Sequence, residues 1–329
     1  MFMNRHLLFA VTMLTVLNAA AQNIQLNDIT NGKFRQETMT EVRPLADGES
    51  YAMISSDGNR IEVFSFLTGK PAGVLFDAMT ARGEKIAHID GYIMSPDQRN
   101  ILIQTNTHYI YRRSFTATYF IYNVQNNKLV PLSDGGPQQS PVWSPDGNVV
   151  AFVRDNNIHL VKLLYDNAES QVTKDGKRNE VINGIPDWVY EEEFSTNSSM
   201  VFSADSRQII WIRYDETDVP QYSMQMFKGM APEMEQYRDY PGDYTYKYPV
   251  PGKQNSKVKV LSYDIKSHQT RTLDLPLDAD GYIPRIKATS DPEKVAIFTL
   301  NRHQDNLKIY MANPLSTVCK LIIEDKVDK

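Results

Sequence analysis

The residues best suited to chemistry lie in one short run, residues 187–193, which reads Asp-Trp-Val-Tyr-Glu-Glu-Glu. Its two aromatic side chains predict that the segment is packed, so that some of its carboxylates lie near one another with limited hydration. Mutual repulsion is costly there, and a bound cation would relieve it. The alternative is an ordinary solvated face, which is what a run of glutamates on a strand or helix surface usually forms.

A second candidate is the pair Arg112-Arg113, which follows Tyr-Ile-Tyr at residues 109–111. A planar guanidinium group could balance the charge of the carboxylate run, or it could grip a carbonyl oxygen through its fork of N–H donors. Paired arginines on a strand are more often solvated surface residues, and that alternative stays open.

The sequence lacks the other motifs that would indicate catalysis. A serine nucleophile elbow requires Gly-x-Ser-x-Gly between a strand and a helix, and the nearest match, Gly-Glu-Ser-Tyr-Ala at 48–52, has no final glycine. The six histidines stand singly, without another metal ligand at zinc spacing. We therefore expect no catalytic residue, no metal and no cofactor in this chain.

Short alternating runs, broken by Asp, Asn and Gly, would position the two candidates. Residues 148–153 and 158–163, for example, flank the turn Asp-Asn-Asn at 155–157, and Asn126-Asn127 likewise separates two apolar runs. Such turn residues tolerate the positive φ that tight hairpins require. The pattern predicts β-strands joined by hairpins, with almost no helix.

A repeated turn punctuates these hairpins. Ser-Pro-Asp or a related sequence precedes an apolar strand at 94–97, 143–147, 202–205 and 289–292, with a weaker copy at 55–58. A spacing of roughly 50 to 60 residues, stretched once by an insertion, is typical of a propeller with about four strands per blade. A single blade cannot bury both of its faces without neighbours. We therefore predict an all-β chain that forms a partial β-propeller of about four to five four-stranded blades.

The first 21 residues are typical of a cleaved secretory signal peptide. Arg5 precedes an apolar run at 7–17, and three alanines end at Ala21 before Gln22. The apolar run is shorter than the roughly 20 residues that cross a bilayer, so we expect no membrane span after cleavage. Because Cys319 is the only cysteine, the exported chain folds without an internal disulfide. These features predict a secreted or periplasmic protein of the bacterial cell envelope.

Residues 22–329 would then form one propeller domain, interrupted by an insertion at about 215–257. The insertion is rich in Met and Tyr, which suits a protein interface; the alternative is a disordered tip that folds back on its own blade. The formal net charge of −5 and the absence of a basic cluster argue against a nucleic-acid partner.

Residues 187–193 resemble the signature Asp-Trp-Val-Tyr-Glu-Glu-Glu of the dipeptidyl peptidase IV family of serine peptidases. Residues 111–119, 213–220 and 248–253 also resemble segments of that family's N-terminal β-propeller, in the same order. The resemblance runs from about Arg43 to the end of the chain.

The resemblance implies a substrate site. Glu192 and Glu193 would bind the free α-amino group of a peptide, and Arg112 would hold the carbonyl of its penultimate residue. Enzymes of this family release N-terminal Xaa-Pro or Xaa-Ala dipeptides. Their catalytic Ser, Asp and His lie in a C-terminal α/β-hydrolase domain, which we expect to be encoded downstream, so that this chain alone would be inactive.

The resemblance also implies an eight-bladed propeller, of which this sequence supplies about half to two thirds, and a second copy that pairs through the insertion. Two other functions stay open. The chain could be a stand-alone peptide-binding or protein-interaction module, which would bind free N-terminal amines without cleavage, or a structural or decayed remnant.

Overall fold

The computed structural model describes residues 23–36, 38–39, 41–229 and 233–327. The predicted signal peptide, residues 1–21, lies outside them. The chain divides into two compact units, Met1–Thr40 and Glu41–Lys329. In the smaller unit, one short helix, α2 (Leu26–Thr30), begins where the Asp28 carboxylate accepts the N–H of Gln25 at 3.0 Å. Within the described ranges no helix is long and apolar enough to cross a membrane.

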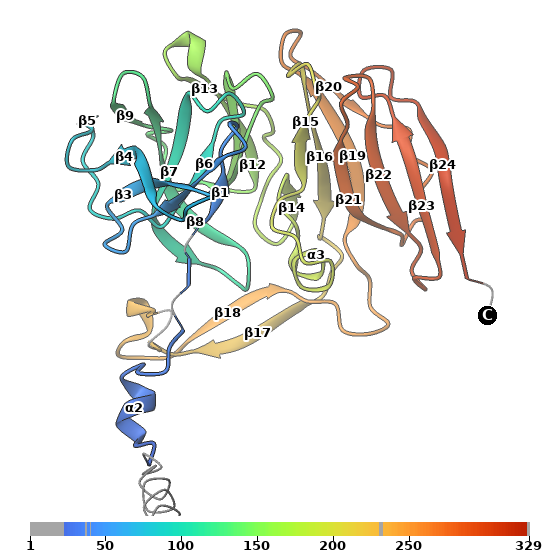
Figure 1. Cartoon of the computed structure of the whole chain (residues 1–329). Coiled ribbons are helices and arrows are strands. Elements are labelled where there is room, and N and C mark those ends of the chain that lie inside the picture. Colours follow the sequence, from blue (N-terminus) through green and yellow to red (C-terminus); the bar gives the residue numbers. More distant parts are fainter. Residues whose placement is uncertain (1–22, 37, 40, 230–232, 328–329) are drawn as a thin grey trace, which may run out of the picture. The chain divides into compact units, whose positions relative to one another are not determined.

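The larger unit consists of five sheets, which we call blades 1 to 5, and a separate two-stranded hairpin (Figure 1). Blade 1 contains β1 (Arg43–Pro44), β2 (Ser50–Ile54), β3 (Arg60–Ser65) and β4 (Pro71–Asp77); blade 2 contains β5 (Arg82–Gly83), β6 (Gly91–Met94), β7 (Asn100–Tyr109), β8 (Phe115–Asn123) and β9 (Lys128–Pro131). Blade 3 contains β10 (Gln139–Trp143), β11 (Val149–Arg154), β12 (Asn157–Lys162) and β13 (Ala168–Gln171), with the 3-10 turn η1 (Leu163–Tyr165) before β13. Blade 4 contains β14 (Val181–Asn183), β15 (Met200–Phe202), β16 (Gln208–Asp215), β19 (Lys257–Asp264) and β20 (Gln269–Thr272); blade 5 contains β21 (Tyr282–Ala288), β22 (Val295–Leu300), β23 (Asn306–Ala312) and β24 (Cys319–Lys326).

Each blade is built from strands that are close in sequence. Neighbouring strands pair antiparallel, apart from the short parallel contact of β5 with β9. The sequence pattern therefore predicted the sheets correctly, although blades 2 and 4 each carry a fifth strand.

The repeated turn has one geometry in four blades. A serine hydroxyl donates to the aspartate two residues on, and the same hydroxyl accepts the N–H five residues on, which closes the turn between two paired strands. The Ser–Asp pairs, with their Oγ to Oδ1 distances, are Ser55 with Asp57 (2.5 Å), Ser95 with Asp97 (2.7 Å), Ser144 with Asp146 (2.6 Å) and Ser203 with Asp205 (2.6 Å). The copy at 55–58, weaker in sequence, thus has the full geometry. In blade 5, Thr289 instead bonds to backbone groups of Asp291 and Lys294.

The apolar faces of neighbouring blades pack on one another. One buried cluster joins blades 1 and 2, a second joins blades 2 and 3, and the largest, around Trp211, joins blades 3, 4 and 5. These three clusters are what the stacking of blades requires, because a single sheet cannot bury its two faces without neighbours.

Blade 4 has two excursions that matter for function. The helix α3 (Trp188–Glu193) lies between β14 and β15, and the hairpin of β17 (Gln221–Met226) and β18 (Gly242–Lys247) lies between β16 and β19. The 3-10 turn η2 (Glu235–Tyr237) precedes β18. Because β16 and β19 pair from Gln208 with Asp264 to Asp215 with Lys257, the hairpin leaves and rejoins the blade at one end of a continuous ladder. The hairpin lies within the predicted insertion.

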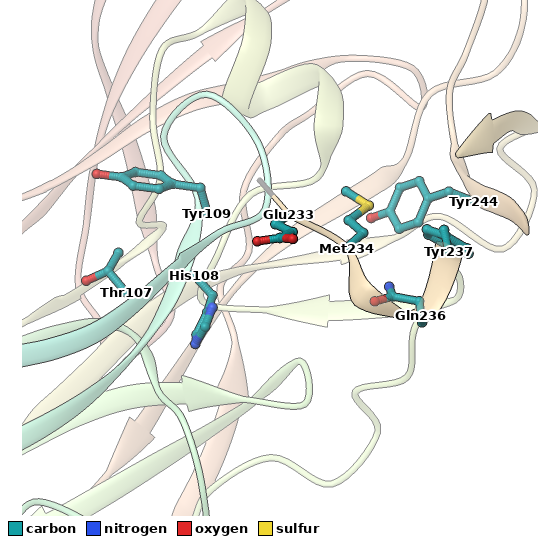
Figure 2. Close-up of a pocket in the computed structure, with 8 residues that line it drawn as sticks. All are labelled: Thr107, His108, Tyr109, Glu233, Met234, Gln236, Tyr237 and Tyr244. Carbon is teal, nitrogen blue, oxygen red and sulfur yellow. The ribbon is translucent and has the colours of Figure 1, made fainter. Parts of the chain in front are cut away.

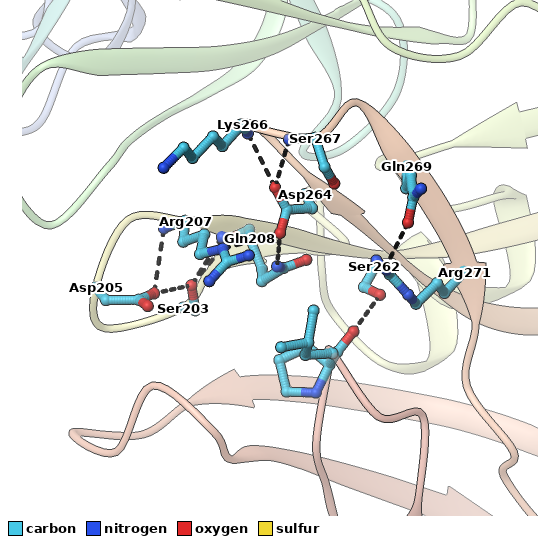
Figure 3. Close-up of polar contacts among 12 residues, drawn as sticks. Ser203, Asp205, Arg207, Gln208, Ser262, Asp264, Lys266, Ser267, Gln269 and Arg271 are labelled. Carbon is cyan, nitrogen blue, oxygen red and sulfur yellow. Dashed lines mark hydrogen bonds and ion pairs between the residues drawn. The ribbon is translucent and has the colours of Figure 1, made fainter.

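At the other end of that ladder lies Asp264, a carboxylate whose two oxygens each accept two hydrogen bonds (Figure 3). Its side chain is fully buried. One oxygen accepts the N–H groups of Lys266 (3.0 Å) and Ser267 (2.8 Å), and the other accepts Arg207 Nε (2.8 Å) and Gln208 Nε2 (2.9 Å). Burial alone would raise the pKa of Asp264, but these donors outweigh it and hold the pKa at about 2.

Candidate functional site

The carboxylate run forms the helix α3, which begins at Asp187. The Asp187 carboxylate accepts the N–H of Tyr190 at 2.9 Å, as an N-cap does. Its other oxygen accepts the hydroxyl of Ser256 at 2.5 Å, next to β19. Burial raises the pKa of Asp187, and these hydrogen bonds oppose the rise. The helix is thus fixed to its own blade at its first turn.

Blade 5 fixes the other side of α3. Tyr190 is buried, and its hydroxyl oxygen accepts the N–H of Ile283 at 3.0 Å. The guanidinium group of Arg285 donates to the carbonyl of Phe194, just past the end of the helix. The prediction that the run is packed rather than a solvated face is therefore confirmed for its aromatic side.

The three glutamates of α3 have three different environments. Glu191 is buried, and its Oε1 accepts the N–H groups of Arg113 (2.7 Å) and Ser114 (2.8 Å). Glu192 is mostly buried; its Oε1 lies 3.2 Å from Arg112 Nη1, while its Oε2 is buried and has no hydrogen-bond partner among the described residues. Glu193 is exposed. The three glutamates therefore do not share one environment, because successive helical residues point about 100° apart.

The paired arginines also divide their roles. The loop that carries them joins β7 to β8 in blade 2. Arg112 is well exposed, at 65% of its side chain, and faces Glu192. Arg113 turns back onto α3, where Nη1 donates to the Glu191 carbonyl (3.2 Å) and Nη2 to the Ser195 hydroxyl (3.1 Å). Arg112 is therefore the more exposed of the two guanidinium groups.

Aromatic rings join this site to the hairpin. Tyr111 lies 6.0 Å from Trp188, and Trp188 packs edge-on against Tyr248 at 4.4 Å. Tyr248 in turn lies 5.7 Å from Tyr222 of β17. Sequence reasoning did not identify this contact, since the tyrosines of the insertion carry no signal for which surface they pack against.

A pocket of about 700 Å³ lies on another side of the same loop (Figure 2). Its lining comes from the end of β7 and from the hairpin: Thr107, His108, Tyr109, Glu233, Met234, Gln236, Tyr237 and Tyr244. The carboxylate of Glu233 is already paired with Lys228 at 2.8 Å. Glu192 differs in that its second oxygen is buried without a hydrogen-bond partner among the described residues.

The structure brings together two of the three residues predicted for the substrate site, Arg112 and Glu192, and leaves Glu193 beside them as an exposed side chain. Their roles stay predictions. Within the described part of the chain, no group of three or more His, Cys, Asp or Glu is arranged to hold a metal ion.

Comparisons with known proteins identify the family to which the chain is related. Residues 95–329 match the family model described as the dipeptidyl peptidase IV (DPP IV) N-terminal region. The chain is 38% identical over 242 residues to a probable dipeptidyl-aminopeptidase B of Emericella nidulans, covering 69% of this chain and 26% of that protein. It is 30% identical over 337 residues to the Podospora anserina protein of the same name, covering 94% of this chain and 36% of the relative.

A solved structure, dipeptidyl peptidase 4 of Porphyromonas gingivalis, is 40% identical and superposes with a TM-score of 0.86, covering 92% of this chain and 42% of that one. A putative dipeptidyl aminopeptidase IV of Bacteroides ovatus, at 18% identity and a TM-score of 0.61, shares the fold. The predicted fold, a partial β-propeller, is confirmed. The chain spans about a quarter to two fifths of these relatives. It belongs to the dipeptidyl peptidase IV family and corresponds to that family's N-terminal region.

Proposed function

We propose that this chain is the substrate-recognition propeller of a secreted or periplasmic dipeptidyl peptidase. Glu192 and Glu193 bind the free α-amino group of a peptide, and Arg112 binds the carbonyl of its penultimate residue. Cleavage of N-terminal Xaa-Pro or Xaa-Ala dipeptides requires an α/β-hydrolase domain encoded downstream, and the chain by itself is inactive.

The observation that carries the proposal is the buried, unpartnered Oε2 of Glu192. Leaving a buried carboxylate oxygen without a donor costs free energy, and native structures retain such groups where a ligand or water completes them. A peptide ammonium group brings three N–H donors and a positive charge, which match an oxygen of Glu192 and the exposed carboxylate of Glu193.

Arg112 binds the second group of the peptide, the carbonyl oxygen of its penultimate residue. Its guanidinium group is already oriented by Glu192, yet its exposure leaves N–H donors for a carbonyl oxygen. With the amine and one carbonyl fixed, only the bond after the second residue reaches a nucleophile at a set distance. A peptide with a blocked N-terminus is rejected, because an acetyl group removes the charge and two donors and would leave the carboxylates unpaired.

The test is calorimetric binding of an Xaa-Pro dipeptide, with and without N-acetylation, to the purified chain near neutral pH. We expect binding that acetylation abolishes, and weakening in Glu192→Gln, Glu193→Gln and Arg112→Lys, since an ammonium point charge cannot replace the planar fork. Equal binding of the acetylated and free peptides would contradict the amine site. An unchanged affinity in Arg112→Lys would remove Arg112 from it.

A further inference from the structure

The loop that carries Arg112 is fixed to α3 through the first glutamate of the run. Both N–H groups at its tip, those of Arg113 and Ser114, point at one oxygen of Glu191, at 2.7 and 2.8 Å. Glu191 is 5% exposed, so these bonds lie out of water. Two backbone donors on one buried carboxylate oxygen form a strong, directional attachment.

Arg113 closes the same contact from the other side. Its side chain donates to the Glu191 carbonyl and to Ser195, and its own carbonyl accepts Asn197 Nδ2 at 3.2 Å. The loop and the helix are thus attached mainly through main-chain and side-chain groups of Glu191 and Arg113. We call Glu191 and Arg113 the clamp pair.

Beside these bonds, the loop contacts α3 through Arg112, which faces Glu192, and through Tyr111, whose ring lies 6.0 Å from Trp188. Tyr109 and Ile110 are exposed, at 66% and 51%. The N–H groups of Ile110 and Tyr111 both turn inward to the carbonyl of Ser114, which shapes the loop but does not attach it to α3. The clamp pair is adjacent in sequence to the gripping pair, Arg112 and Glu192, on both segments.

We propose that Glu191 is a positioning residue: together with Arg113 it sets the position of the Arg112 guanidinium group relative to Glu192, and with it the geometry in which the two bind the peptide carbonyl and amine. The inference rests on the proposed function of that pair. The first glutamate of the run therefore acts on substrate binding through Arg112 rather than by touching substrate.

Blade 4 offers a matched control. Asp264 is also a buried carboxylate with one oxygen that accepts two successive backbone N–H groups, those of Lys266 and Ser267, but it lies at the opposite end of the β16–β19 ladder from the hairpin. Asp264→Ala removes the same kind of attachment away from the site. Glu191→Gln is the conservative variant, because the amide oxygen of Gln can still accept both N–H groups.

The experiment measures affinity for an Xaa-Pro dipeptide in Glu191→Ala, Glu191→Gln and Asp264→Ala, and hydrogen exchange at the amides of Arg113 and Ser114. We expect Glu191→Ala to weaken binding by about tenfold or more and to speed exchange at both amides. Glu191→Gln should restore both properties, and Asp264→Ala, measured where it is folded, should match wild type in both. Wild-type affinity in a folded Glu191→Ala chain overturns the proposal.

A double-mutant cycle separates positioning from general destabilisation. In an Arg112→Ala background, Glu191→Ala should cost less than about threefold, because the residue that it positions is gone; an undiminished cost overturns the proposal. If Glu191→Ala does not fold, Arg113→Met takes its place in the cycle. If the wild-type chain binds no dipeptide, the proposed function fails for this chain. Hydrogen exchange then tests the clamp pair by itself: unchanged exchange at the Arg113 and Ser114 amides in Glu191→Ala overturns the proposal.

Discussion

Two carboxylates of blade 4 show how differently the same group can be used. Asp264 has four hydrogen bonds to its two oxygens, and its pKa is held at about 2. Glu192 has an arginine 3.2 Å from one oxygen, and its other oxygen is buried without a hydrogen-bond partner in the part of the chain that the structure describes. A carboxylate whose oxygens all have hydrogen-bond donors stabilises the fold. A buried oxygen without a donor carries a free-energy cost, which a ligand can remove by donating a hydrogen bond. The comparison predicts opposite responses to the same isosteric substitution.

Asp264→Asn should have the largest effect on stability. The new amide group faces the donors of Arg207 and Gln208 in place of an oxygen that accepted them. We expect a loss of about 3 kcal/mol in the free energy of unfolding, measured by urea denaturation. A loss below about 1 kcal/mol would mean that water replaces these bonds and that Asp264 is not a structural carboxylate.

Glu192→Gln should weaken ligand binding and leave the free energy of unfolding almost unchanged. Its unfolding free energy should stay within about 0.5 kcal/mol of wild type, because Oε2 has no bond to lose among the described residues. Affinity for a free-amine dipeptide should fall about 30-fold, since bonds to a charged group contribute roughly 2 kcal/mol. Calorimetry and urea denaturation on the same sample check both; a large loss of stability would put Glu192 in the same class as Asp264.

The low pKa of Asp264 should make the stability of the chain fall in acid. The folded-state pKa of Asp264 lies below its ordinary value of 3.8. Its contribution is therefore complete above about pH 4 and is lost as the pH falls through about 2, which amounts to about 2 kcal/mol. Unfolding free energies between pH 4 and pH 2 should fall more steeply for wild type than for Asp264→Asn, and parallel curves would contradict the assigned pKa.

Glu216 extends the comparison to a carboxylate with too few donors. It is buried, and burial, followed by the charge of Asp187, raises its pKa to about 7 against an opposing effect of Lys247. The folded state thus holds this proton more tightly than the unfolded chain, and stability falls as the pH rises from about 4.5 to 7. Between pH 5 and pH 8, Glu216→Gln should lose about 2.5 kcal/mol less stability than wild type. Equal losses would show that Glu216 is not buried as a neutral acid.

Local chemistry explains what the sequence predicted well. The hydrogen bonds of the repeated turn, from Ser144 to Asp146 and from Val149 to Ser144, span at most five residues, so the motif is visible in any short window. The packing of α3 was recognisable because Trp188 and Tyr190 lie within the run, whereas the N-cap role of Asp187 was not identified from the sequence. The partial propeller follows from the turn and its spacing.

The division of labour within the site could not be predicted in the same way. Glu191 is structural because its partners, the N–H groups of Arg113 and Ser114, lie 78 and 77 positions away in sequence. Nothing local distinguishes it from Glu192, so the sequence could not separate the carboxylate that holds the loop from the one that faces Arg112. Asp264 escaped notice as well, since Asp-Ile-Lys-Ser at 264–267 has the composition of an ordinary hairpin turn.

The attachment of α3 to its neighbours has a consequence for the order in which the site matures during synthesis. The loop that carries Arg112 leaves the ribosome first, and the helix follows with Glu191 and Glu192. The bond from Ile283 to Tyr190 spans 93 residues and that from Arg285 to Phe194 spans 91, so neither can form until the first strand of blade 5 has emerged. The nascent chain therefore contains Arg112, Glu192 and Glu193 well before these two attachments of α3 to blade 5 can form.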